Sequence, residues 1–228
     1  MSQGSARDGA RDLDAMVPQE EIPHVYDRLA GVYDIWARLT ESRARDRAIE
    51  LAAIVDGQSI LEVAVGTGLA FHEIVRRNPH GQNLGIDLSA GMLAKARSRM
   101  STLPAASYRL EVGTAFDLPV QPGSIDILVN NYMFDLIPHA DMDRILDEFT
   151  RVLKVGGRLV LVNMARGRSL ASRIYEGIYR LSPRAMGGCR GVDMVDRLRR
   201  HRFTVDAREY HQQFLFPSEV VVARKDAR

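Results

Sequence analysis

The stretch that decides the fold is ILEVAVGTGLAFHEI, residues 60–74. It opens with an apolar run of strand length that contains one acid, Glu62, and that ends at Gly66-Thr67-Gly68. Beyond the glycines, the apolar residues recur at the spacing of a helix. The pattern predicts a buried strand, a tight turn and a helix. Glycines in such a turn allow the backbone to approach a ligand closely.

The residues on both sides of this stretch repeat the alternation of strand and helix. Strands are predicted at 59–65, 82–88, 107–115, 125–133 and 158–165, and helices at 69–79, 90–100 and 139–154. Ser89 is placed to cap the second of these helices, and Gly156-Gly157 are expected to end the third. Alternation of this kind implies a parallel sheet that is covered on both faces.

The end of the chain breaks the alternation. Two strand candidates, 203–214 and 218–225, have no helix between them and only a tight gap at Pro217. They are expected to pair as an antiparallel hairpin at one edge of the sheet. The predicted fold class is therefore α/β, a doubly wound, seven-stranded, mostly parallel sheet with an antiparallel C-terminal hairpin.

Composition indicates a soluble globular protein. Of 228 residues, 46% are hydrophobic and 26% charged, and the net charge of +2 gives no argument for a nucleic-acid partner. The single cysteine, Cys189, rules out an internal disulfide and fits a reducing compartment. The sequence shows no metal-ligand spacing, no apolar core of a signal peptide and no stretch of transmembrane length. We expect a cytoplasmic protein without a metal site.

Two kinds of ligand suit a glycine turn at the end of a parallel strand. A dinucleotide such as NAD uses this architecture, but its fingerprint has a third glycine where this chain has Phe71. Glu62 lies close to the turn, where it would repel a pyrophosphate and attract a cofactor that carries an ammonium and a sulfonium. Asp87 ends the second strand, where a carboxylate accepts hydrogen bonds from ribose hydroxyls, and this suits either ligand.

Five sequence blocks resemble class I S-adenosylmethionine-dependent methyltransferases in order and spacing, in particular the ubiquinone/menaquinone-biosynthesis C-methyltransferase group. The blocks are LEVAVGTG (61–68), GIDLSAGML (85–93), GTAFDLPV (113–120), SIDILVNNYMFDLI (124–137) and RVLKVGGRLVLVN (151–163). The resemblance runs from about Tyr26 to the end of the chain. It implies a Rossmann-like methyltransferase fold, S-adenosylmethionine as the cofactor, and an enzyme that transfers a methyl group.

The resemblance also assigns residues to the two ends of the cofactor. At the methionine end it implies Glu62, Gly66-Thr67-Gly68 and, at the end of the fourth strand, Asn131. Tyr33 matches the N-terminal helix that closes over the cofactor in this group, and Asp87 matches the residue that holds the ribose hydroxyls. The adenine is assigned to four residues: Leu88, Met92, Thr114 and Ala115.

Two positions depart from the pattern of the family. Ala64 stands where the first glycine is usual, and Thr114 stands where an aspartate often accepts the adenine amino hydrogen. A hydroxyl can still accept this hydrogen bond, more weakly than a carboxylate. No Asp–His or Lys–Asp pairing in the sequence indicates a general base, so no catalytic residue is assigned.

Residues 1–20 are interpreted as a flexible tail and 21–228 as a single domain, with a helical lid at 21–55 and a substrate-side insertion at 166–200. The expected acceptor is a small or lipid-like molecule: a quinol, a phospholipid head group, an aromatic natural product or a thiol. An apolar helix face in the insertion leaves open a transient contact with a membrane surface. Two other functions also stay open, an NAD-dependent oxidoreductase and a cofactor-binding protein that transfers no methyl group.

Overall fold

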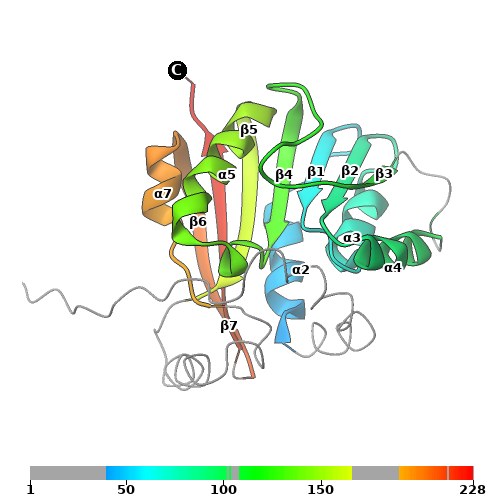
Figure 1. Cartoon of the computed structure of the whole chain (residues 1–228), viewed down its shortest axis with the longest axis horizontal. Coiled ribbons are helices and arrows are strands. Elements are labelled where there is room, and N and C mark those ends of the chain that lie inside the picture. The colour runs from blue at the N-terminus through cyan, green and yellow to red at the C-terminus, as the bar shows by residue number, and fades with distance from the viewer. Residues whose placement is uncertain (1–39, 102, 104–107, 166–189, 215, 228) are drawn as a thin grey trace, which may run out of the picture.

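A computed structural model describes residues 40–101, 103, 108–165, 190–214 and 216–227 (Figure 1). Tyr33, residues 21–39 of the expected lid and residues 166–189 of the expected insertion lie outside the described residues. The division into tail, lid and insertion therefore stays a prediction. None of the described helices is long and apolar enough to cross a membrane.

Seven strands form one sheet in the order β3-β2-β1-β4-β5-β7-β6 (Figure 1). Their bounds are β1 Ser59–Val63, β2 Gln82–Asp87, β3 Tyr108–Val112, β4 Ile125–Asn131, β5 Leu153–Met164, β6 Phe203–Gln213 and β7 Phe216–Lys225. The first five strands run parallel to one another, whereas β7 pairs antiparallel with both β5 and β6. The predicted doubly wound sheet and its antiparallel hairpin are thereby confirmed.

The strand order reverses beside β1. From β1 the chain moves outward to β2 and β3, and then returns to place β4 on the other side of β1. At such a point the connections leave in opposite directions and open a crevice at the carboxyl ends of the strands. Glu62 of β1 and Val129 of β4 are register partners, so the C-terminal residues of both strands meet at this crevice.

Helices cover both faces of the sheet. α2 (Ser42–Leu51), α3 (Leu69–Arg77) and α4 (Ala90–Met100) lie on one face, and α5 (His139–Val152) and α7 (Val195–Arg200) lie on the other. Successive strand residues point to opposite faces, so Ile60 packs with α2 and α3 while Leu61 and Val63 pack with α5. By the same alternation, Glu62 points to the face that α2 covers.

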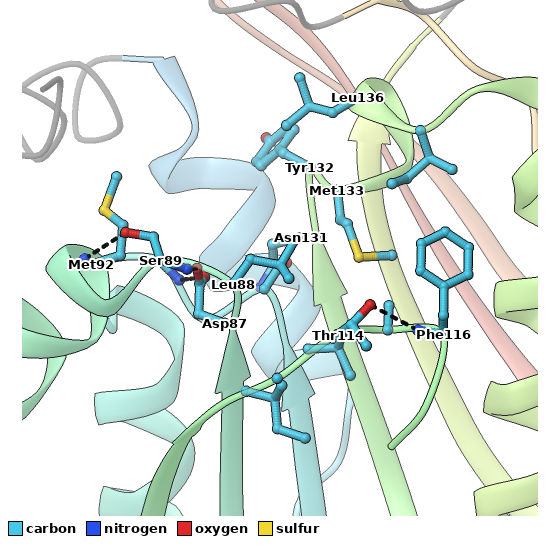
Figure 2. A pocket seen from close by; sticks show the side chains of 17 residues that line it. Asp87, Leu88, Ser89, Met92, Thr114, Phe116, Asn131, Tyr132, Met133 and Leu136 are labelled. Carbon is cyan, nitrogen blue, oxygen red and sulfur yellow. Dashed lines mark hydrogen bonds between the residues drawn. The ribbon is translucent and has the colours of Figure 1, made fainter. Parts of the chain in front are cut away.

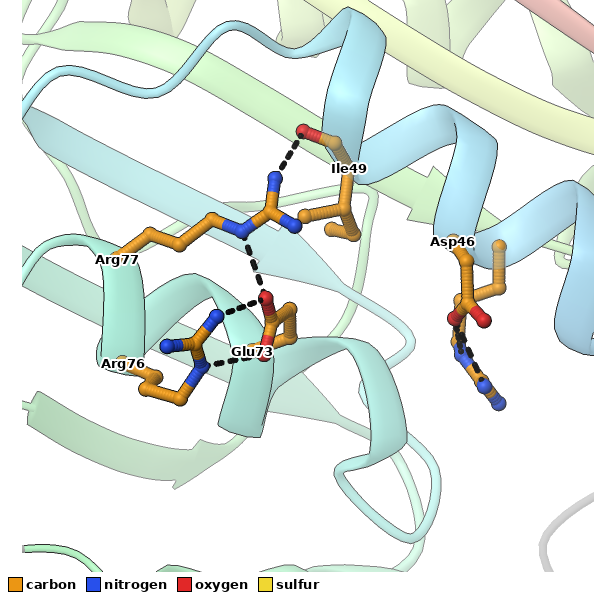
Figure 3. A network of polar contacts seen from close by, with 6 residues as sticks. Asp46, Ile49, Glu73, Arg76 and Arg77 are labelled. Atoms are coloured by element: carbon orange, nitrogen blue, oxygen red, sulfur yellow. Dashed lines mark hydrogen bonds and ion pairs between the residues drawn. The ribbon is translucent and has the colours of Figure 1, made fainter.

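A surface network ties α2 to α3 (Figure 3). Arg76 donates two hydrogen bonds of 2.8 Å to Glu73, and Arg77 donates one of 2.7 Å to Glu73 and another of 3.3 Å to the carbonyl of Ile49 in α2. Hydrogen bonds from Arg76, and then from Arg77, lower the pKa of Glu73 to about 2. Because these charges are partly exposed, the network contributes little to the stability of the fold.

Phe71 occupies the position at which a dinucleotide-binding turn has its third glycine. Its side chain is fully buried, and the room for it comes from Gly85 on β2, where a Cβ would lie 3.2 Å from Cε2 of Phe71. The same Cβ would lie 2.7 Å from a side-chain carbon of Leu110 and 2.8 Å from one of Val65. A glycine on the neighbouring strand thus provides the space that a glycine on the helix would have provided.

The end of α5 differs from the sequence-based prediction. The helix ends at Val152 and β5 begins at Leu153, so Gly156-Gly157 lie inside the strand. Val152 and Leu153 are fully buried, and the carbonyl of Val152 accepts from the amide of Ser124 at 3.0 Å. Leu153 pairs with Ile125 before the register shifts, and Gly156 has a φ of 75°. Contacts with the chain around the start of β4 therefore end the helix earlier than its own sequence indicates.

Candidate functional site

The turn after β1 contains three residues with left-handed backbone conformation. Ala64, Gly66 and Gly68 have φ angles of 62°, 56° and 81°. A Cβ on Gly68 would lie 3.0 Å from the Cβ of Ala96 in α4, so this glycine allows α3 and α4 to pack closely. A Cβ on Gly66 would have no described atom within 4 Å. One glycine therefore permits helix packing, and the other leaves open space beside the turn.

Asp87 at the end of β2 holds this turn from the neighbouring strand. Its Oδ2 accepts from the amide of Gly66 at 2.7 Å, and its Oδ1 accepts from the amide of Ser89 at 2.8 Å. Ser89 caps α4 by accepting from the amide of Met92 at 2.9 Å, which confirms the predicted cap. The two oxygens of Asp87 thus hold the glycine turn and the start of α4 together.

The described residues line a cavity at the carboxyl ends of β1, β2 and β4 (Figure 2). Asp87 and Leu88 lie on one side of it, and Phe116 and Met133 lie on the opposite side. Seven residues assigned from the sequence line this cavity: Gly66, Asp87, Leu88, Met92, Thr114, Ala115 and Asn131. The crevice thus brings together residues from four separate sequence blocks.

A smaller cavity adjoins the first at the glycine turn. The two cavities share four lining residues: Ala64, Gly66, Asn131 and Tyr132. Glu62 and Thr67, both assigned from the sequence, line the smaller cavity, together with Glu41 and Arg45 from the start of α2. Of the assigned residues that the structure describes, Gly68 alone lines neither cavity.

Glu62 is a buried carboxyl with an unused acceptor. Its side chain is 1% exposed, and its Oε1 accepts from Nδ2 of Asn131 at 3.2 Å. Its Oε2 and the Oδ1 of Asn131 are buried and find no hydrogen-bond partner among the described residues. Burial raises the pKa of Glu62 to about 8, and the charge of Asp87 contributes, while the bond from Asn131 and the charge of Arg45 oppose the shift. Such a carboxyl is suited to receive a cationic donor.

Tyr132 and Arg45 are two of the cavity-lining residues that sequence reasoning missed. Tyr132 has a φ of 54°, and its hydroxyl forms a 2.7 Å hydrogen bond with Oγ of Ser218 on β7. A left-handed non-glycine residue costs about 1–2 kcal/mol, and Tyr132 and Ala64 thus place backbone strain at the ends of two neighbouring strands. The position of Tyr132 directly after Asn131 was the available signal. No sequence signal indicated Arg45, because it lies in a run of arginines that is typical of a solvated helix face.

The strand order, the glycine turn and the acid at the end of β2 match the fold of class I S-adenosylmethionine-dependent methyltransferases. Residues 60–157 match the family model described as methyltransferase domain. The chain therefore carries a class I methyltransferase domain, and the resemblance seen in the five sequence blocks is confirmed.

Among curated relatives, the chain is 32% identical to a demethylmenaquinone methyltransferase of Thermotoga maritima, over 61% of this chain and 60% of the relative. It is 30% identical to a ubiquinone/menaquinone biosynthesis C-methyltransferase of Geobacter sulfurreducens, over 70% of this chain and 63% of the relative. The matched part thus spans less than two thirds of the length of these relatives.

Solved structures share the fold at lower identity. A geranyl diphosphate C-methyltransferase of Streptomyces coelicolor, solved with S-adenosyl-L-homocysteine, superposes with a TM-score of 0.67 at 16% identity, over 81% of this chain and 79% of that one. The cyclase SpnF superposes with a TM-score of 0.74 at 17% identity, over 96% of this chain and 100% of that one. At such identities the likeness establishes the fold alone.

The cofactor of this class of domain is S-adenosylmethionine, and the described residues fit it. The buried Oε2 of Glu62 finds no donor among the described residues, and an ammonium group would supply one. A Cβ at Gly66 would enter space that lies beside both cavities. The carboxylate of Asp87, a group that accepts hydrogen bonds from hydroxyls, lines the larger cavity together with the apolar side chain of Leu88.

Proposed function

We propose that this chain transfers a methyl group from S-adenosylmethionine to an apolar small molecule of the quinol type. The observation that carries the proposal is the composition of the larger cavity, which joins a polar wall to an apolar one. Asp87 and Asn131 belong to the polar wall, and Phe116, Met133 and Ile137 belong to the apolar wall. A polar cofactor and an apolar acceptor would therefore share one cavity.

The polar contacts proposed for the cofactor follow from this arrangement. Glu62 and Asn131 receive its methionine end beside the backbone of Gly66 and Thr67, and Asp87 accepts hydrogen bonds from its ribose hydroxyls. Asp87 is already oriented by the amides of Gly66 and Ser89, so ribose binding requires no reorientation of its carboxylate.

The adenine contacts proposed for the cofactor lie on both sides of Asp87. Leu88 is an apolar residue that is 52% exposed, and an adenine ring would cover it. Met92 and Ala115 are buried and line the same cavity. Oγ1 of Thr114 accepts from the amide of Phe116 at 3.3 Å and keeps a second lone pair for the adenine amino group.

When bound, S-adenosylmethionine supplies a methyl group on a positively charged sulfur that is a good leaving group. The residues of the chain then align the acceptor and exclude water, which lowers the barrier through proximity and orientation. Among the described residues that line the larger cavity, Asp87 and Tyr132 are the titratable ones, and both make hydrogen bonds. We assign no general base.

The apolar wall supports an uncharged acceptor. No lysine or arginine is among the described residues that line the larger cavity, so a phosphate group there would lose its solvation without gaining a cation. A quinol ring presents an apolar body and activated carbon and oxygen nucleophiles. The names of the curated relatives, which refer to menaquinone and ubiquinone biosynthesis, support the same acceptor class.

The shared fold with a cyclase shows that this architecture does not determine the reaction by itself. Cofactor binding without methyl transfer is therefore the second candidate function. A useful test has to follow the methyl group rather than the cofactor.

The test is a transfer assay with methyl-labelled S-adenosylmethionine and two acceptors, a short-chain demethylmenaquinol and geranyl diphosphate with Mg²⁺. We expect label in the quinol, with a strong loss in Glu62→Gln. Glu73→Gln, a change of the same residue type on the surface of α3, should leave transfer unchanged. Label in geranyl diphosphate alone would contradict the acceptor class. Binding of S-adenosylhomocysteine without transfer to either compound would contradict the quinol reaction and favour the second candidate. Binding of NAD alone would favour an oxidoreductase.

A further inference from the structure

We propose that Arg45 binds the α-carboxylate at the methionine end of the cofactor, opposite Glu62. The inference rests on the proposed function, because it assigns a new residue to the same cofactor. The five family-like sequence blocks do not include Arg45. It is the three-dimensional position of α2 that brings it to the site.

Arg45 differs from the other arginines at the start of α2 in where its side chain lies. Ala44, Ala48 and Ile49 form the buried face of α2, and Arg45 stands one helical turn before Ile49. Its side chain is 17% exposed and lines the smaller cavity, whereas Arg43 is exposed. The helix therefore directs one guanidinium towards the glycine turn.

The guanidinium of Arg45 has a donor to spare. Its Nε and Nη2 both donate to Oδ1 of Asp46, at 3.2 and 3.0 Å. Its Nη1 is buried and finds no hydrogen-bond partner among the described residues. An arginine cannot relieve this by losing its proton, so a buried Nη1 without a partner calls for an acceptor. A carboxylate, which accepts two parallel bonds from a guanidinium, is the group that suits it best.

The charges around the smaller cavity match an amino-acid group. Arg45 is the only cation among the described residues that line it, and Glu62 offers an acceptor that finds no described donor. A zwitterion would place its ammonium at Glu62 and its carboxylate at Arg45. Glu41 lines the cavity as well, and its charge acts on Asp135, whose pKa it helps to raise. The cavity thus has one cationic position for the carboxylate.

A purely structural role for Arg45, through its pair with Asp46, predicts a different behaviour. Removal of a structural arginine lowers the affinity for every ligand of the cavity to the same degree. Removal of an arginine that binds the carboxylate lowers the affinity only for ligands that carry the carboxylate. The two roles are therefore separated by comparing two ligands on one variant.

The experiment measures the affinity of S-adenosylhomocysteine and of its decarboxylated analogue, which keeps the amine, by calorimetry. Arg45→Ala should lower the affinity for S-adenosylhomocysteine by roughly 10- to 100-fold, the range of a charged hydrogen bond, and leave the analogue nearly unchanged. Arg45→Lys should recover part of the loss, since it restores the charge but not the planar fork. Arg43→Ala, an exposed arginine of the same helix, is the matched control and should change neither affinity.

Equal losses for both ligands in Arg45→Ala, or no loss for either, would overturn the assignment of Arg45 while leaving the proposed function intact. Failure of the unmodified protein to bind S-adenosylhomocysteine would instead overturn the proposed function itself. If Arg45→Ala does not fold, Arg45→Lys gives the same comparison of the two ligands, and an unchanged preference for the carboxylate with a lower affinity for both would count against the assignment.

Discussion

Glu62→Gln is expected to stabilise the ligand-free protein at neutral and alkaline pH while it weakens cofactor binding. Glu62 is 1% exposed, and burial raises its pKa from 4.5 to about 8. Between these two values the carboxyl is ionised in the unfolded chain and protonated in the folded protein. The stability that this carboxyl contributes is therefore fully present below a pH of 4.5 and is lost as the pH rises to about 8.

The size of the effect follows from the two pKa values of Glu62. The difference between 4.5 and about 8 corresponds to roughly 5 kcal/mol of unfolding free energy above pH 8, at about 1.36 kcal/mol per pKa unit. At pH 7, only the interval from the unfolded-state pKa of 4.5 up to the pH contributes, and this corresponds to about 3 kcal/mol of unfolding free energy. Glutamine has no proton to lose, and its carbonyl oxygen can still accept the hydrogen bond from Nδ2 of Asn131.

Urea unfolding of both proteins at about pH 5, 7 and 8.5 measures this difference, which should grow with pH in favour of Glu62→Gln. Glu73→Gln is the control of opposite sign. The pKa of Glu73 is lowered to about 2, so its contribution is present above 4.5 and is lost as the pH falls towards 2. Because Glu73 is partly exposed, that contribution should stay below about 1 kcal/mol and constant across the range measured.

Two results would refute this reasoning. A stability difference between Glu62→Gln and the unmodified protein that does not change with pH would show that Glu62 is not protonated in the folded state. Tighter binding of S-adenosylhomocysteine by Glu62→Gln at pH 7 would show that its carboxylate does not receive the ammonium. In the unmodified protein, we also expect binding at pH 7 to release a proton, which calorimetry in buffers of different ionisation enthalpy measures.

Three further predictions concern the glycine turn and its acid. Asp87→Ala should weaken S-adenosylhomocysteine binding by about 2–3 kcal/mol, and it should also lower stability by about 1–3 kcal/mol because two amides lose their acceptor; unchanged affinity in calorimetry would remove Asp87 from the ribose site. Gly68→Ala should lower the melting temperature because its Cβ would meet Ala96 at 3.0 Å. Gly66→Ala should cost about 1–2 kcal/mol of strain and abolish binding of S-adenosylhomocysteine. If calorimetry shows that Gly66→Ala still binds S-adenosylhomocysteine while Gly68→Ala does not, the division of roles between the two glycines is contradicted. Ala64→Gly should stabilise the protein by about 1 kcal/mol in urea unfolding, since it relieves a φ of 62°, and a lower stability would mean that the alanine is not strained.

Local sequence patterns were enough to predict most of the elements and the outline of the site. The apolar run around Glu62, the glycines after it and the serine cap at position 89 each depend on residues a few positions apart. Such spacing reflects backbone geometry, which the chain carries wherever it folds. The acid at the end of β2 could be found in the same way, because a parallel sheet brings the carboxyl ends of its strands to one edge.

Other features depend on contacts between distant segments and could not be predicted locally. The helix α5 ends at Val152 because its last residues meet the chain before β4, although the next residues continue the helical pattern. Arg45 lies in a run of arginines. Only the packing of α2 on the sheet places its side chain at the cavity beside Gly66. The strained backbone of Tyr132 likewise goes with contacts to two distant strands, because its amide donates to the carbonyl of Val162 on β5 and its hydroxyl forms a hydrogen bond with Ser218 on β7.

The sequence by itself determined the alternation of strands and helices, the position of the glycine turn and the identity of the acids beside it. These follow from periodicity and residue type, which act over a few residues. Only the tertiary structure decided that Glu62 is buried with an oxygen that finds no donor in the described part of the chain, that its pKa rises to about 8, and that Arg45 lines the same cavity. The physical reason is that burial and electrostatic interaction are properties of the space around a group, and that space is built by segments from the whole length of the chain.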